Sequence, residues 1–135
     1  MRRILAVKGC HGLRQRIEKD VEGKNDVDAL RAMAAAMRNF ALERPGLAAA
    51  TFRSEASDCA EWRQAGGELA QTALQVFAKT GIKGEPAEQA LRILRGLVRG
   101  LVMHETSASF FVDPSEYQRT FDLGIELFIN GIPRS

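Results

Sequence analysis

Length, composition and charge place this chain among single-domain globular proteins. It has 135 residues, of which 45% are hydrophobic and 27% are charged, enough to bury one core. The net charge of +2 arises from interspersed acidic and basic residues, which argues against direct binding to DNA by this chain. The first apolar run ends at Lys8, too soon for a signal peptide or a membrane span, so we expect a cytoplasmic protein with no membrane partner.

The first half of the chain shows helical periodicity. Apolar positions gather on one side of a helix from Arg3 to Glu22, although Gly9 and Gly12 predict that it bends or begins late. A second helix is expected to be capped by Asn25 or Asp26 and to stop at Pro45 and Gly46. A short helical segment over Leu47–Phe52 follows. A fourth helix, ended by Gly81, has candidate caps at Ser54, Ser57 and Asp58.

The stretch from Pro86 to His104 is apolar on a front wider than one core-facing stripe. Its charges form a narrow stripe, consisting of Arg92, Arg95 and Arg99. Gly96 and Gly100 lie four residues apart, and each costs about 1 kcal/mol of helix propensity relative to alanine. A close helix–helix contact at these glycines would offset that cost, although glycines at this spacing also occur by chance.

The last helix has a well-defined start signal. Asp113 is expected to be its cap, Pro114 its first residue and Glu116 the partner in a capping box. Its apolar face is wide and runs to Ile132, with Leu123 extending that face around the cylinder.

These patterns predict an all-α fold, in one domain over residues 1–135, because no segment alternates as a strand does. The last two long helices carry more apolar surface than one copy can cover, which predicts a homodimer with a four-helix bundle at its centre. The expected interface residues are Leu94, Gly96, Leu97, Gly100, Leu101, Phe121, Gly124, Ile125 and Phe128.

Catalytic motifs are missing from the sequence. It has no phosphate loop, no nucleophile elbow and no His or Cys pair at metal-ligand spacing. A metal cluster of Cys10, His11, Cys59 and His104 has no supporting spacing, and the two cysteines do not make a disulfide framework. We therefore expect neither an enzyme nor a bound cofactor or metal.

The large apolar side chains favour a pocket for a small hydrophobic molecule over a catalytic or metal site. Methionine and aromatic residues suit adaptable apolar pockets, although each of these residues could equally be ordinary core. The candidates are Met33, Met37, Phe40, Phe52, Trp62, Leu69 and Met103.

Three segments resemble one protein family. The run from Phe40 to Leu47, continuing to Phe52, resembles the helix, proline turn and short helix in the regulatory domain of TetR-family bacterial transcriptional regulators. The run from Phe121 to Ile132 is similar to the last helix of that domain. The Pro86–His104 helix resembles the branch called WHG. Arg95 and Arg99 stand where that branch often carries Trp and His, and Gly100 matches its Gly.

The resemblance implies an effector-sensing and dimerisation domain. The effector would be a small, mainly hydrophobic molecule bound between helices, with His11 or His104 giving a polar contact. DNA would be a partner only through a helix-turn-helix domain, which we do not find before Arg3. The alternative is a free-standing, all-α homodimeric interaction protein that does not bind DNA itself.

Overall fold

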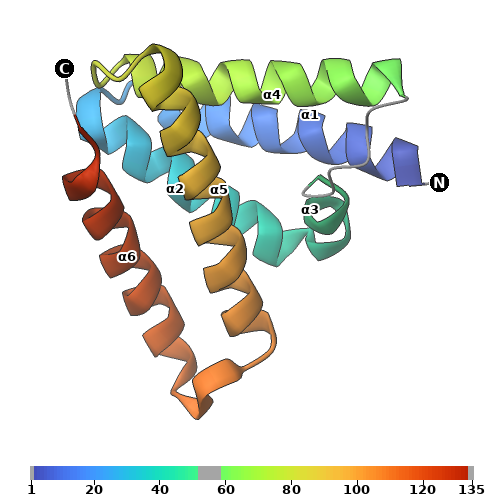
Figure 1. Cartoon of the computed structure of the whole chain (residues 1–135). Coiled ribbons are helices and arrows are strands. Elements are labelled where there is room, and N and C mark those ends of the chain that lie inside the picture. Colours follow the sequence, from blue (N-terminus) through green and yellow to red (C-terminus); the bar gives the residue numbers. More distant parts are fainter. Residues whose placement is uncertain (1, 52–58, 134–135) are drawn as a thin grey trace.

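The computed structural model describes residues 2–51 and 59–133, and every element in these ranges is helical, which confirms the all-α prediction (Figure 1). In chain order the elements are α1 (Arg2–Val21), α2 (Asp26–Glu43), α3 (Pro45–Thr51), α4 (Ala60–Ala78), α5 (Gly84–Thr106), the 3-10 turn η1 (Ser109–Phe111) and α6 (Pro114–Gly131).

The helices form two groups that share α2. Helices α1 and α4 lie side by side, whereas α5 and α6 form an antiparallel pair joined through η1 (Figure 1). Helix α2 passes between the two groups and contacts each of the other five α-helices. Its position explains why buried residues cover more than half of its circumference, from Ala29 to Ala41, whereas Arg31 and Ala35 lie on an exposed side.

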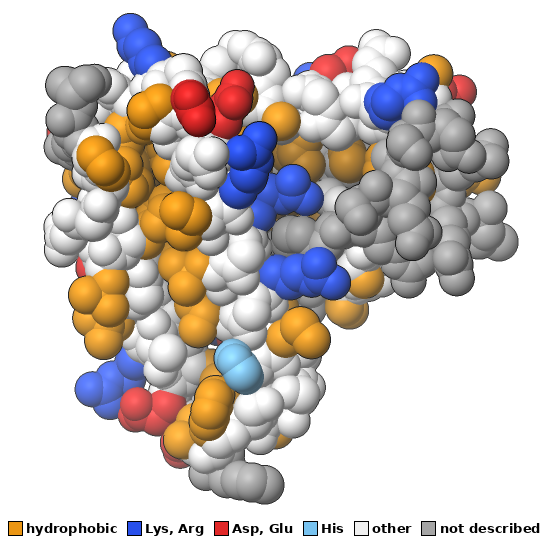
Figure 2. Space-filling view, viewed as in Figure 1, with side chains coloured by type: hydrophobic (Ala, Val, Ile, Leu, Met, Phe, Trp, Pro, Cys, Tyr) orange, Lys and Arg blue, Asp and Glu red, His pale blue; other side chains and the backbone are white. Residues whose placement is uncertain are grey.

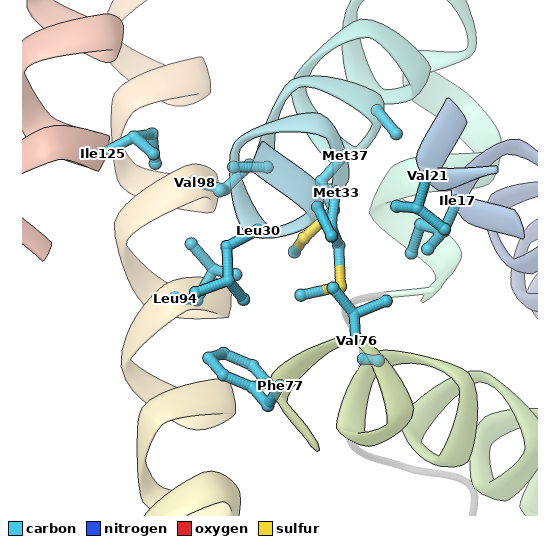
Figure 3. Packing of buried hydrophobic residues seen from close by; sticks show 14 of the residues in the cluster. Ile17, Val21, Leu30, Met33, Met37, Val76, Phe77, Leu94, Val98 and Ile125 are labelled. Carbon is cyan, nitrogen blue, oxygen red and sulfur yellow. The ribbon is translucent and has the colours of Figure 1, made fainter. Parts of the chain in front are cut away.

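The core lies where α2 meets its neighbours. Side chains from α1, α2, α4, α5 and α6 converge there, with Met33 fully enclosed (Figure 3). The largest fully buried side chains are Phe77, Ile17, Leu30, Met33, Leu94 and Val98. Removing this apolar surface from water is the main stabilising contribution to such a fold.

The glycines of α1 permit two close helix contacts. A Cβ at Gly9 would collide with the Thr51 Oγ1 and stand 2.6 Å from the Leu47 carbonyl oxygen of α3. A Cβ at Gly12 would lie 3.1 Å from the ring of Phe40 on α2. Helix α1 is unbroken from Arg2, so the late start predicted from these glycines is wrong. Tertiary packing against α2 and α3 outweighs their low helix propensity.

Several boundaries differ from the sequence-based expectation. Pro45 opens α3 instead of only stopping α2, because proline is well tolerated in a first helical turn. Helix α5 begins at Gly84, two residues earlier than expected, and continues beyond His104 to Thr106. Asn25 occupies the N-cap position of α2, although its side chain makes no capping hydrogen bond.

The capping predictions for α6 are confirmed in part, and those for α4 are not tested. The Asp113 carboxylate accepts a hydrogen bond from the Ser115 backbone N–H at 3.0 Å, which confirms it as the cap of α6. The capping box is wrong, because the Glu116 carboxylate instead accepts a hydrogen bond from Arg119. The proposed caps of α4 at Ser54, Ser57 and Asp58 lie outside the described residues, and Cys59 is the N-cap residue.

We predict that Gly9→Ala destabilises the fold by about 1–3 kcal/mol, because the added methyl group forces α1 away from α3. Urea unfolding at matched protein concentration measures the change. Gly67→Ala is the control, since Gly67 lies in α4 with open space around it, and it should stabilise the helix by up to about 1 kcal/mol. Equal stability of Gly9→Ala and wild type would contradict the close packing of α1 on α3.

Candidate ligand-binding cavity

A cavity of about 300 Å³ lies among helices α1 to α5. Its wall is mainly apolar, with a few polar groups, and its volume is at the lower end of the range for small-molecule sites. The lining residues are Cys10, Leu13, Ile17, Met37, Thr51, Trp62, Arg63, Gly66, Leu69, Ala70, Ala73, Leu91 and Arg95.

Three of the sequence-predicted ligand contacts meet in this cavity. Met37 comes from α2, whereas Trp62 and Leu69 come from α4. Met33 is enclosed in the core instead, and Phe40 lines a separate surface hollow beside Gly12 and Leu47. Predicted residue Phe52 lies outside the described residues.

The remaining predicted contacts are not part of the cavity lining. His11 is half-buried on α1. Met103 and His104 lie near the C-terminal end of α5, whereas α5 lines the cavity with Leu91 and Arg95, about two turns earlier. Met103 is exposed, and the His104 ring packs against Phe110 with the ring centroids 4.7 Å apart.

Sequence reasoning did not assign the contribution of α1 and the basic residues to this cavity. Cys10, Leu13 and Ile17 lie on the apolar side expected for the first helix, but an apolar side in the sequence does not reveal an incompletely filled space behind it. Burial raises the pKa of the Cys10 thiol, and the positive charge of Arg95 lowers it by a smaller amount. The thiol is therefore a neutral wall group at neutral pH.

A partly buried polar cluster, centred on Arg38, connects α2 to α5 and α6 one residue beyond the cavity contact Met37. The Arg38 guanidinium donates to both carboxylate oxygens of Glu105 on α5, at 2.8 and 2.9 Å, and also to the side chain of Gln118 on α6. It lies over the Phe121 ring, 5.5 Å from the centroid. Arg38 is itself buried, so this cluster ties the cavity wall to the α5–α6 pair through charge-assisted hydrogen bonds.

The predicted interface residues divide between the core and the surface. Leu94, Phe121 and Ile125 are buried by their own chain and therefore belong to the core. Gly96 and Gly100 have open space beside them. The remaining interface residues are half-buried, at the border between the core and the surface; they are Leu97, Leu101, Gly124 and Phe128.

The α5–α6 pair nevertheless leaves large apolar side chains uncovered. On α5, Ile93 is 60% and Met103 61% exposed, and on α6 Leu123 is 61% and Leu127 64% exposed. Figure 2 shows hydrophobic side chains across this face of the two helices, with basic side chains along the other side of α5. Spacing alone predicted the surplus of apolar surface but assigned some of its residues incorrectly.

No group of three or more His, Cys, Asp or Glu side chains among the described residues could hold a metal ion. None of the helices in that part of the chain is long and apolar enough to cross a membrane.

A family model matches most of the chain. The model of the tetracyclin repressor-like C-terminal domain matches residues 30–128, from α2 to most of α6. The chain therefore belongs to this family, whose domains sense ligands and dimerise in TetR regulators. No curated protein matches the chain.

We predict that Arg38→Met lowers the free energy of unfolding by about 1–3 kcal/mol. The substitution leaves Glu105, which is partly exposed, without its cationic partner in a poorly solvated position. Chemical denaturation at matched protein concentration measures the loss. Arg44→Met removes an exposed arginine at the end of α2 and should change stability by less than about 0.5 kcal/mol. Similar effects of the two substitutions would count against a structural role for the Arg38 cluster.

Proposed function

We propose that this chain is the effector-sensing and dimerisation domain of a TetR-like transcriptional regulator, and that its effector is a small, mainly apolar molecule. The observation that carries the proposal is the cavity of about 300 Å³ beside Met37, Trp62 and Leu69. Adaptable and aromatic side chains around an unfilled space are typical of sites for apolar ligands.

Helix α1 is the element through which binding would act on DNA recognition. Its residues Cys10, Leu13 and Ile17 form one wall of the cavity, so an occupant changes the packing of this helix directly. In a full-length regulator α1 would continue from the helix-turn-helix reader. A coupling free energy of about 1–3 kcal/mol between ligand and operator would suffice to change the affinity for DNA 5- to 150-fold.

The uncovered face of α5 and α6 supports self-association. Ile93 and Met103 on α5 lie on the same side as the open Gly96 and Gly100, because these positions repeat every three or four residues. A second copy packing on this side would bring helix backbones close together and cover the side chains of α6 that a single chain leaves exposed.

A free-standing interaction protein would share this dimer face. Such a protein does not require an unfilled apolar space, whereas an effector domain requires one to hold its ligand. The wall of this space contains Met37 and Trp62. The cavity therefore favours the sensing function over the alternative.

We predict that the uncharged dye N-phenyl-1-naphthylamine binds in the cavity with micromolar affinity and quenches Trp62, the single tryptophan of the chain, by energy transfer. Gly66→Leu places a side chain in the cavity and should abolish the quenching. Gly67→Leu is the matched control, since Gly67 is the next residue of α4 and does not line the cavity. An affinity that is the same in both variants, or no quenching in wild type, would remove the cavity as the site.

We predict that Leu123→Lys combined with Leu127→Lys weakens dimerisation by at least about 100-fold. The reason is that four exposed leucines per dimer lose apolar contact, at about 1.5–3 kcal/mol for each fully buried leucine, and like charges meet. Light scattering coupled to size exclusion gives the mass. Ile4→Lys, at an equally exposed apolar residue of α1, should leave the dimer intact. A wild-type monomer at tens of micromolar would refute the interface.

A further inference from the structure

The charged lining residues that the structure describes all carry a positive charge. Both charged lining residues are arginines, Arg63 on α4 and Arg95 on α5, and no lining residue that the structure describes carries a carboxylate. Their side chains are exposed, so the guanidinium groups stand at the rim, where the cavity meets solvent. The apolar body of the cavity lies behind them, against α1 and α2.

Arg95 differs from the paired arginines of this protein. Arg16, Arg31 and Arg38 each bind a carboxylate, at 2.7–3.0 Å. Arg95 makes neither a hydrogen bond nor an ion pair with any residue in the described ranges. It lies one helical turn after Leu91, another lining residue, which directs this side of α5 towards the cavity.

The positive charge of Arg95 acts on a group in the cavity wall. It lowers the pKa of the Cys10 thiol on the opposite helix α1, against the larger raising effect of burial. A guanidinium whose charge acts on a thiol at this wall also attracts an anion placed at the rim, which lies closer to it than the wall does.

We propose that the effector is a small apolar molecule with a single anionic head group, that its body fills the cavity, and that its head group binds Arg95 at the rim. The proposal rests on the cavity being the effector site, and it adds the chemical class of the effector. Guanidinium favours carboxylates and similar planar anions because it can donate two parallel hydrogen bonds.

The size and polarity of the cavity limit this class further. A volume of about 300 Å³ equals that of roughly ten water molecules, each occupying about 30 Å³ in the liquid. This space suits a compact aromatic or medium-length aliphatic acid better than a large polar molecule. A cationic ligand would meet the guanidinium of Arg95 and no carboxylate among the described lining residues, so we expect it to be rejected.

A matched pair of dyes tests the proposal. 1-Anilinonaphthalene-8-sulfonate differs from N-phenyl-1-naphthylamine by its sulfonate, and both quench Trp62 when bound nearby. We expect wild type to bind the sulfonate dye more tightly and to lose this preference as sodium chloride is raised. Arg95→Gln should lower the affinity for the sulfonate dye by about threefold to tenfold, as expected for the loss of an ion pair near solvent. The same substitution should not change the affinity for the uncharged dye.

The controls separate this inference from the proposed function. Arg92→Gln removes an exposed arginine of α5 that does not line the cavity, and it should leave both affinities unchanged. Equal binding of both dyes, or equal effects of Arg95→Gln and Arg92→Gln, would overturn the anionic class while leaving the cavity as a ligand site. Binding of neither dye, or dye binding that survives Gly66→Leu, would overturn the cavity function and this inference with it.

Discussion

The burial of α2 over more than half of its circumference is the constraint on which the other elements depend. This helix contacts every other α-helix, and its buried residues include several alanines together with Leu30, Met33 and Met37. Small side chains allow neighbours to approach closely, and the larger ones fill the core where five helices meet (Figure 3). The same helix presents Met37 to the cavity and, at the next position, Arg38 to α5 and α6. The candidate ligand site and the α5–α6 pair are therefore both positioned by α2.

The α5–α6 pair shows how one amphipathic pattern serves two surfaces. One side of each helix packs into the core, through Leu94 and Val98 on α5 and Ile125 on α6. The opposite side keeps Ile93 and Leu127 exposed. Arg31 of α2 also binds Glu126 of α6, at 2.7 Å, so α6 is held to the core by charge as well as by apolar packing. This exposed pair interaction lowers the pKa of the Glu126 carboxyl through a hydrogen bond.

The helix order, the all-α class and most helix limits could be predicted from apolar periodicity and from capping residues such as Asp113. The cavity could be predicted only in part. Periodicity identifies which face of a helix is apolar, but not whether that face is tightly packed, so Met33 and Met37 look alike in sequence and only Met37 lines the cavity. Met103 was expected inside because it is apolar, yet it belongs to the part of a wide apolar front that α5 leaves exposed. Arg95 was recognised as part of a charged stripe, and only the position of α5 relative to α4 shows that it reaches the rim.

The contact at Gly9 has a consequence for motion. The α1 backbone rests against the Leu47 carbonyl and the Thr51 hydroxyl, which is itself bonded to that carbonyl at 2.7 Å. No side chain separates the two helices at this point, so their relative position is set by direct contact with the α1 backbone. A displacement of α1 towards α3 would therefore push directly on the α3 backbone, with no flexible side chain between them to absorb it.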